Sequence, residues 1–131
     1  MRRGLIRSQL VLVAALAGLC LWTAVGAQAK TFSTSATLGF NPPDNFSGQV
    51  SSPYKPCKSG RLVTLYYHGP GSLDPPQMVE AAKTDKGGHY EINVIPAAQP
   101  GDYHVIVSKR LIHKQGRVTK CRQFVSPQQN F

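Results

Sequence analysis

Two cysteines are the residues whose chemistry is easiest to predict in this chain of 131 residues. Neither Cys57 nor Cys121 has another Cys or a His two to four positions away, which is the spacing that zinc sites normally show. In an oxidising compartment such a pair forms a disulfide, which here would close a loop of about 65 residues and contribute about 4 kcal/mol in the chain-entropy model. We therefore predict a Cys57–Cys121 disulfide. A reactive thiol and half of a metal site are the open alternatives.

The first 29 residues have the three parts of a secretory signal peptide. A basic start precedes an apolar run over residues 10–25, and Ala27 and Ala29 flank one polar residue where a signal peptidase would cut. We predict a helical signal peptide over residues 1–29, cleavage between Ala29 and Lys30, and a secreted or extracytoplasmic mature form that does not span a membrane. The alternatives are lipid attachment at Cys20 and an uncleaved anchor, although the run is shorter than the roughly 20 residues a spanning helix needs.

A basic run near the C-terminus is the feature with the clearest functional meaning. Six cations and no acid occur within 14 residues: Lys109, Arg110, Lys114, Arg117, Lys120 and Arg122. Such a run attracts an anionic polymer, an acidic polysaccharide or membrane headgroups. The other interpretation, which we favour for the run taken alone, is a solvated edge hairpin whose charges prevent pairing with other strands. Nucleic acid is not expected as a partner, because no aromatic residues for base stacking are interleaved in the run and the domain is exported.

The histidines and acids predict neither a metal site nor an enzyme. The four histidines, His68, His89, His104 and His113, contain no pair spaced by two residues, which would place both on one strand face. The six acids are scattered mostly in turn-like sequence, and no Gly-x-Ser-x-Gly nucleophile motif occurs. We therefore expect no catalytic residue, no metal and no cofactor.

The elements that must position these residues are short strands. Runs of alternating apolar and polar residues, rich in β-branched and aromatic side chains, are separated by Gly, Pro and Asp, and no window after residue 30 has helical periodicity. We expect strands at 46–50, 61–68, 78–84, 89–95, 103–108, 109–114 and 117–125, with a tight turn at 85–88. The inward sets are Val63, Leu65 and Tyr67; Tyr90, Ile92 and Val94; and Tyr103, Val105 and Val107. These strands predict an all-β fold, an antiparallel seven-stranded β-sandwich over residues 46–131, preceded by an N-terminal strand or tether over 30–45.

Four motifs in sequence order resemble those of a known family. They are Phe46-x-Gly48-x-Val50, Arg61-x-Val63-x-Leu65-Tyr66, Thr84-Asp85-x-x-Gly88-x-Tyr90-x-Ile92 and Pro100-Gly101-x-Tyr103-x-Val105-x-Val107. Together they resemble the prealbumin-like (immunoglobulin-like) domains of the carboxypeptidase regulatory-like and transthyretin-like group. Residues 53–60, with Cys57, depart from the family pattern. The resemblance implies a secreted, single-domain, mainly non-catalytic sandwich. The group's ring-opening hydrolase ends in Tyr-Arg-Gly-Ser, whereas this chain ends in Gln-Gln-Asn-Phe.

The expected function is therefore that of a non-catalytic secreted binding or structural module. It would attach to an anionic or carbohydrate polymer or to a protein of the cell surface. The alternatives are a carbohydrate-binding or protein-interaction accessory domain and, less favoured, a small hydrolase of the transthyretin-like type. The N-terminal segment and the loop over residues 69–77 are expected to carry any specific surface, with Tyr54, Tyr66 and His68 as candidate residues. The sequence leaves the oligomeric state open.

Overall fold

The computed structural model describes residues 29–71 and 73–131, so residues 1–28 of the predicted signal peptide lie outside the described residues. The described chain forms twelve strands and one short 3₁₀ helix, so the all-β prediction is confirmed. The elements are β1 (Lys30–Phe32), β2 (Ser35–Ala36), β3 (Gly39–Asn41), β4 (Asn45–Ser51), η1 (Lys55–Cys57), β5 (Leu62–His68), β6 (Gln77–Lys83), β7 (His89–Asn93), β8 (Asp102–Val107), β9 (Arg110–Lys114), β10 (Arg117–Cys121), β11 (Phe124–Val125) and β12 (Gln129–Asn130). No helix long and apolar enough to cross a membrane occurs among them.

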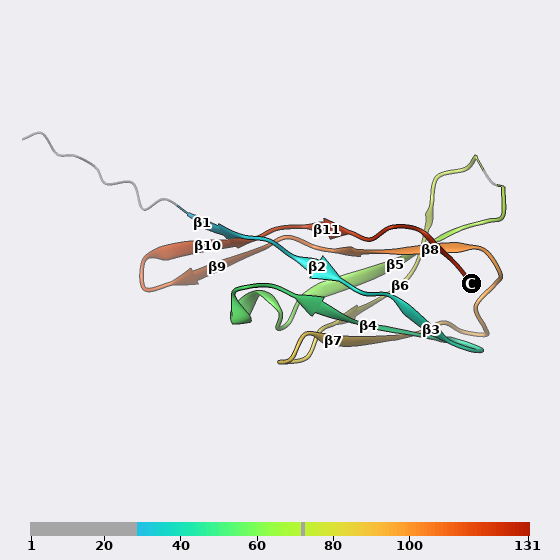
Figure 1. The fold of residues 1–131 in the computed structure, drawn as a ribbon, viewed down its shortest axis with the longest axis horizontal. Coiled ribbons are helices and arrows are strands. Elements are labelled where there is room, and N and C mark those ends of the chain that lie inside the picture. The colour runs from blue at the N-terminus through green and yellow to red at the C-terminus, as the bar shows by residue number, and fades with distance from the viewer. Residues whose placement is uncertain (1–28, 72) are drawn as a thin grey trace, which may run out of the picture.

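Two sheets face each other in a sandwich-like arrangement (Figure 1). The main sheet has the order β11-β8-β5-β6, with β12 also paired to β8, and the opposing strands are β2, β3, β4 and β7, with β4 at their centre. Neighbouring strands within these two layers run antiparallel. Residues 30–45, expected as a strand or tether, form the three short strands β1, β2 and β3.

The core lies between the two sheets because each long strand turns alternate residues inward. The buried cluster is Leu38, Phe46, Val50, Val63, Leu65, Tyr90, Ile92, Tyr103, Val105 and Val107, with Tyr67 and Val94 packed at its margin. Seven of the nine residues in the predicted inward-facing sets are therefore in the buried core, and Tyr67 and Val94 lie at its margin. The rings of Phe46 and Tyr103 meet across the two layers with 4.6 Å between their centroids.

A third, smaller sheet projects from the sandwich, and we call it the arm. It consists of the β9–β10 hairpin with β1 paired in parallel against β10. In Figure 1 the arm extends beyond the two layers, at the end away from the C-terminus. Gln115 and Gly116 close the hairpin with φ angles of 51° and 72°. Positive φ at both central residues is what a two-residue type I′ hairpin turn requires.

The arm corrects one part of the predicted topology. The strand expected over residues 117–125 ends at Cys121, and Phe124–Val125 is a separate strand that pairs with β8 of the main sheet. At this point the backbone of Arg122 is held on both sides: its N–H donates to Phe32 O, and its carbonyl accepts from the Arg61 side chain. Consequently β9 and β10 belong to the arm and not to either sandwich layer.

Candidate functional site

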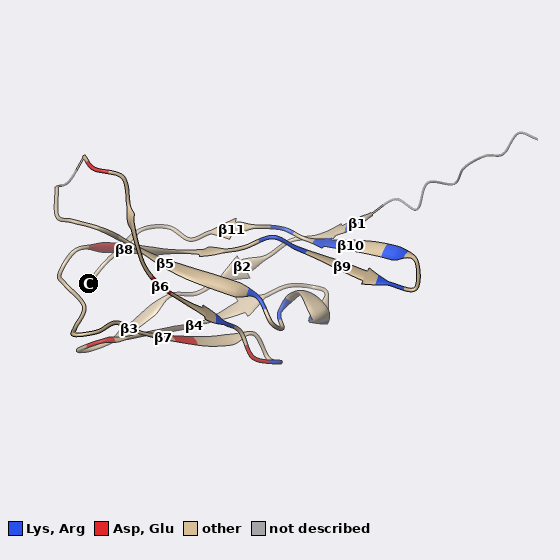
Figure 2. Ribbon diagram, turned by 180° about the vertical axis from the view of Figure 1, so that it is seen from behind, with Lys and Arg blue, Asp and Glu red and all other residues tan. Residues whose placement is uncertain are grey.

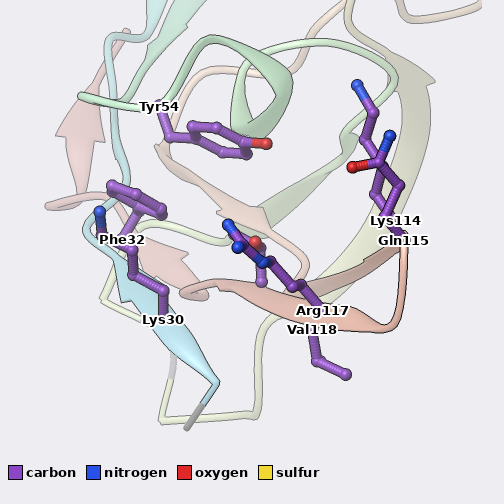
Figure 3. Close-up of a pocket in the computed structure, with 8 residues that line it drawn as sticks. Lys30, Phe32, Tyr54, Lys114, Gln115, Arg117 and Val118 are labelled. Atoms are coloured by element: carbon purple, nitrogen blue, oxygen red, sulfur yellow. The ribbon is translucent and has the colours of Figure 1, made fainter. Parts of the chain in front are cut away.

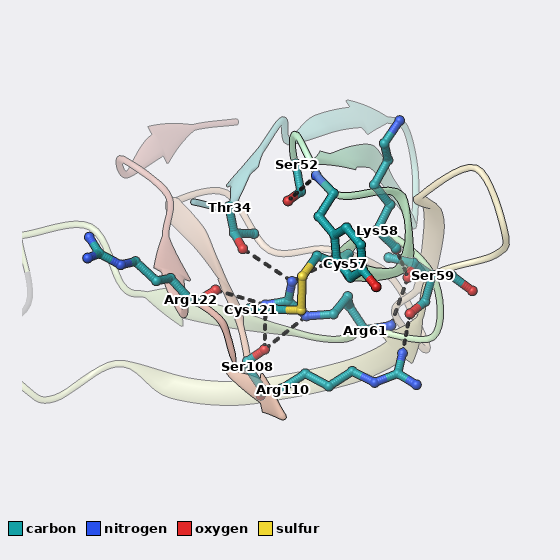
Figure 4. Close-up of a disulfide and its surroundings, with 12 residues drawn as sticks. Thr34, Ser52, Cys57, Lys58, Ser59, Arg61, Ser108, Arg110, Cys121 and Arg122 are labelled. Atoms are coloured by element: carbon teal, nitrogen blue, oxygen red, sulfur yellow. Dashed lines mark hydrogen bonds between the residues drawn. A yellow bond between two sulfur atoms is a disulfide. The ribbon is translucent and has the colours of Figure 1, made fainter. Parts of the chain in front are cut away.

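The predicted disulfide is present and lies at the base of the arm (Figure 4). Cys57 ends η1, in the connection between β4 and β5, and Cys121 ends β10, with 5.5 Å between their Cα atoms. Both residues are buried. The bridge therefore joins the arm to the loop that passes from one sandwich layer to the other. The predicted strand over residues 117–125 would instead place Cys121 in a sheet of the sandwich.

Beside the disulfide lies a buried arginine that the sequence analysis did not select. Arg61 is 1% exposed, and its guanidinium donates to Cys57 O, Ser108 O, Arg122 O and the hydroxyl of Thr34 (Figure 4). All three guanidinium nitrogens take part, over distances of 2.7–3.2 Å. Burial, and secondarily the charge of Arg110, lowers the pKa of Arg61. The planar guanidinium of Arg61 thus connects η1, both ends of the arm hairpin and the N-terminal segment in one hydrogen-bond network.

The six cations of the basic run do not form one continuous patch. Strand register places Arg110, Lys114 and Arg117 on the face of the arm that carries Cys121, because Cys121 pairs with Arg110 and Arg117 pairs with Lys114. Lys120 lies on the opposite face, whereas Lys109 and Arg122 lie just outside the strands. Figure 2 shows blue segments along β9 and β10 and no red on either strand.

The face shared with Cys121 is extended by β1. Lys30 pairs with Thr119 and Phe32 with Cys121, so both side chains join this face while Thr31 joins the other. Tyr54, which precedes η1, stacks on Phe32 with 4.7 Å between ring centroids and 12° between ring planes. The ammonium of Lys30 lies 5.3 Å from the centroid of the Phe32 ring, a cation–π distance.

These side chains line an open hollow of about 610 Å³, which we call the arm hollow (Figure 3). The lining residues are Lys30, Phe32, Tyr54, Lys114, Gln115, Arg117, Val118 and Thr119. In Figure 3 the aromatic pair stands on one side, Lys114 and Gln115 on the other, and Arg117 between them. Three of the lining residues are cationic and none is acidic. An anion that entered would meet several positive charges and an aromatic surface at once.

The three residues predicted for a loop surface, Tyr54, Tyr66 and His68, lie at two separate places in the structure. Tyr54 lines the arm hollow, but Tyr66 and His68 lie on β5, where Tyr66 stacks on His104 of β8 and His68 is also close to His104. The described parts of the loop expected over residues 69–77, which are residues 69–71 and 73–77, lie at the end of the molecule away from the arm (Figure 1). The structure therefore brings Tyr54 together with part of the basic run and brings the other two candidates together with a histidine.

Arg61, Lys30 and Phe32 were not among the predicted site residues, and they differ in whether a local sequence pattern could have indicated them. Arg61 occupies the same alternating positions as Val63, Leu65 and Tyr67, so the period-two pattern already placed it on the inward face. By contrast, the contribution of Lys30 and Phe32 depends on the parallel pairing of β1 with β10. That pairing joins segments almost ninety residues apart, and no local pattern predicts it.

No group of three His, Cys, Asp or Glu side chains able to hold a metal ion occurs among the residues that the structure describes. Comparison with protein-family models, with curated proteins and with solved structures found no match for this chain. The fold and the site thus define an all-β, sandwich-like domain with one disulfide and a cationic, aromatic hollow on a projecting arm. A disulfide is consistent with an extracytoplasmic location.

Proposed function

We propose that this protein is a secreted, non-catalytic binding module that attaches to an anionic polymer of a cell surface through the arm hollow. The observation that carries the proposal is the composition of the hollow: Lys30, Lys114 and Arg117 line it together with two aromatic rings and no acid. Three strands contribute to one face, so backbone pairing fixes the spacing of the positions that carry these charges. A chain of regularly spaced anions can engage several of them together.

The predicted processing site would strengthen this surface. Cleavage after Ala29 makes Lys30 the first residue of the mature protein, and Lys30 already lines the hollow. The new α-amino group, with an ordinary pKa of about 7.7–8.0, would carry a positive charge for most molecules at neutral pH. Signal-peptide removal would thereby add a fourth charge next to the hollow.

Carbohydrate binding is the second candidate function, and the aromatic pair favours it. Tyr54 and Phe32 are both only partly buried, and their rings form one stacked unit at the wall of the hollow. Aromatic rings bury a large area at low entropic cost and pack against the apolar faces of other rings. A polysaccharide with few charges would depend on Tyr54 more than on the cations.

The family proposal agrees with a non-catalytic role. The motifs resemble the transthyretin-like group, and the described residues form a sandwich-like all-β domain. We propose membership in that group, with the β1-β10-β9 arm as this chain's own addition to the sandwich.

Salt-dependent retention tests the main proposal. The protein would be applied to an immobilised acidic polysaccharide and to a neutral one, and eluted with increasing NaCl. We expect retention on the acidic matrix alone and elution near physiological salt, where the screening length is about 8 Å. The double variant Lys114→Gln/Arg117→Gln should elute much earlier. A double variant of Lys83→Gln and Lys86→Gln is the matched control, because it removes the same charge from exposed positions away from the hollow.

The outcomes separate the two candidates. Equal weakening by both double variants would mean that net charge alone drives retention, and it would refute the hollow as the site. Retention on the neutral matrix that resists salt and disappears in Tyr54→Ala, but not in Tyr54→Phe, would favour the carbohydrate candidate. Retention on neither matrix would refute both.

A further inference from the structure

Two of the four histidines meet on the outer face of the main sheet, away from the arm hollow. His68 ends β5, and His104 lies in the adjacent strand β8. The register pairs Tyr66 with His104 and His68 with Asp102, so the two histidines are diagonal neighbours across an antiparallel pair. Their ring centroids are 5.8 Å apart. The spacing along the chain concealed this pair, because the two residues come from different strands.

The His104 ring is held in place and carries an unsatisfied nitrogen. Tyr66 stacks on it, with 5.2 Å between centroids and 9° between ring planes, and the residue is 93% buried, since its exposed fraction is 7%. Its Nδ1 is buried and has no hydrogen-bond partner, and it is the one such side-chain atom among residues 29–71 and 73–131. Buried polar atoms in proteins are almost always paired, so an exception calls for an explanation.

An ion reaches the pair through His68. His68 is only partly buried, so solvent ions can reach the pair from its side.

We propose that His68 and His104 together bind a divalent transition-metal ion, with Cu²⁺ preferred. Two imidazoles that bind one metal at about 2.0–2.1 Å hold their ring centres roughly 4.5–6.5 Å apart, depending on the angle at the metal, and the observed separation of 5.8 Å lies within this range. Imidazole nitrogen suits Cu²⁺ and Zn²⁺, and Cu²⁺ binds most tightly in the divalent series. Because no third protein ligand is in place among the described residues, water completes the coordination and the affinity is moderate.

An acidic residue lies beside the His68–His104 pair, whereas the strands β9 and β10 of the arm carry cations and no acid. Asp102 is the cross-strand neighbour of His68, and its Oδ1 accepts a hydrogen bond of 2.9 Å from the side-chain amide of Asn130. Figure 2 shows this acidic start of β8 in red, at the end of the sandwich away from the blue segments of the arm. The proposed metal site is therefore spatially and electrostatically separate from the arm hollow, and it does not depend on the proposed function.

Copper titration tests the site directly. The protein, without an affinity tag, would be titrated with CuCl₂ in a non-coordinating buffer at pH 7.5 by calorimetry, and the Cu²⁺ spectrum recorded by electron paramagnetic resonance. We expect one equivalent to bind with the hyperfine pattern of two imidazole nitrogens. Loss of even an outer-shell partner weakens metal sites about 10- to 100-fold, so His68→Asn should bind at least about tenfold more weakly.

The remaining two histidines provide the matched control. His89 and His113 are both exposed, on β7 and β9, and the double variant His89→Asn/His113→Asn should bind Cu²⁺ as the unmodified protein does. His104→Asn should also lose binding. If it fails to fold, the partly exposed His68 variant decides the question. Unchanged affinity in His68→Asn, loss of binding in the control, or no stoichiometric binding at 100 μM Cu²⁺ would each overturn the proposal.

Discussion

Replacing Arg61 by Met should remove a large part of this domain's stability without changing its surface. The Arg61 side chain is buried, and its guanidinium connects η1, the N-terminal segment and both ends of the arm hairpin. Methionine fills a similar volume but has no donor. We expect the free energy of unfolding to fall by about 3–5 kcal/mol, because three backbone carbonyls lose their donor and each unsatisfied buried acceptor costs about 1–3 kcal/mol.

The magnitude follows from two opposing contributions. The guanidinium makes five hydrogen bonds of 2.7–3.2 Å to three backbone carbonyls and one hydroxyl, and a hydrogen bond to a charged group contributes about 1.5–3 kcal/mol. The gross loss is offset because the buried charge, with its desolvation cost of several kcal/mol, is removed as well. The carbonyls that remain have no replacement donor, so the balance stays unfavourable.

Urea unfolding of the disulfide-bonded protein, followed by circular dichroism, measures the effect. With a slope of about 2 kcal/mol per molar urea, the midpoint should fall by about 1.5–2.5 M. Arg122→Met is the control, because that side chain is exposed, and it should change stability by less than about 0.5 kcal/mol. Arg61→Lys keeps the charge but offers donors from a single atom, so it should also be destabilised. A loss below about 1 kcal/mol in Arg61→Met, the value of one ordinary hydrogen bond, would refute the reasoning.

Three further predictions concern the bridge, the core and the pH dependence. Replacing Cys57 and Cys121 together by Ser should lower the free energy of unfolding by about 4 kcal/mol, and an unchanged urea midpoint would contradict the cross-link account. Gly48→Ala places a methyl group against a carbonyl and a tyrosine hydroxyl of neighbouring segments and should cost about 1–3 kcal/mol. Gly39→Ala, where the added carbon is 3.6 Å from its nearest neighbour, should cost measurably less. Burial lowers the pKa of His104 in the folded protein. As the pH falls, the unfolded chain therefore protonates this imidazole before the folded protein does. The stability that the neutral His104 ring contributes is complete above about pH 6.5 and is lost as the pH falls from there through the lower folded pKa. His104→Gln should flatten the dependence of the urea midpoint on pH between 7.5 and 5, and an unchanged slope would contradict this assignment.

Local patterns were sufficient for most of the sandwich. The alternation in residues 61–68 and 89–95 placed Val63, Leu65, Tyr90 and Ile92 in the core, because a strand directs successive side chains to opposite faces. The turn at 85–88 was also visible: Gly88 has a φ of 88°, and Gly88 N–H donates to Asp85 O. These features depend on neighbours within a few residues.

The functional surface was less predictable because it depends on contacts between distant segments. The sequence grouped six cations, whereas the pairing of β9 with β10 places three of them on one face and one on the other, and leaves Lys109 and Arg122 outside the strands. It also grouped Tyr54 with Tyr66 and His68, which the fold places apart. Charged and aromatic residues can be counted in a sequence, but strand register decides which of them lie on the same face of a sheet.

The order of residues alone determined that this chain makes strands, which side chains enter the core, and that two cysteines pair. Each of these follows from side-chain alternation, turn chemistry and the absence of zinc-site spacing around Cys57 and Cys121. Tertiary structure decided that the last hairpin leaves the sandwich as an arm, that Lys30 and Phe32 join it, that a buried arginine supports its base, and that His68 meets His104. Those outcomes require segments far apart in the chain to pair in one register, and the free energy of such pairing comes from burial and hydrogen bonding that no local stretch contains.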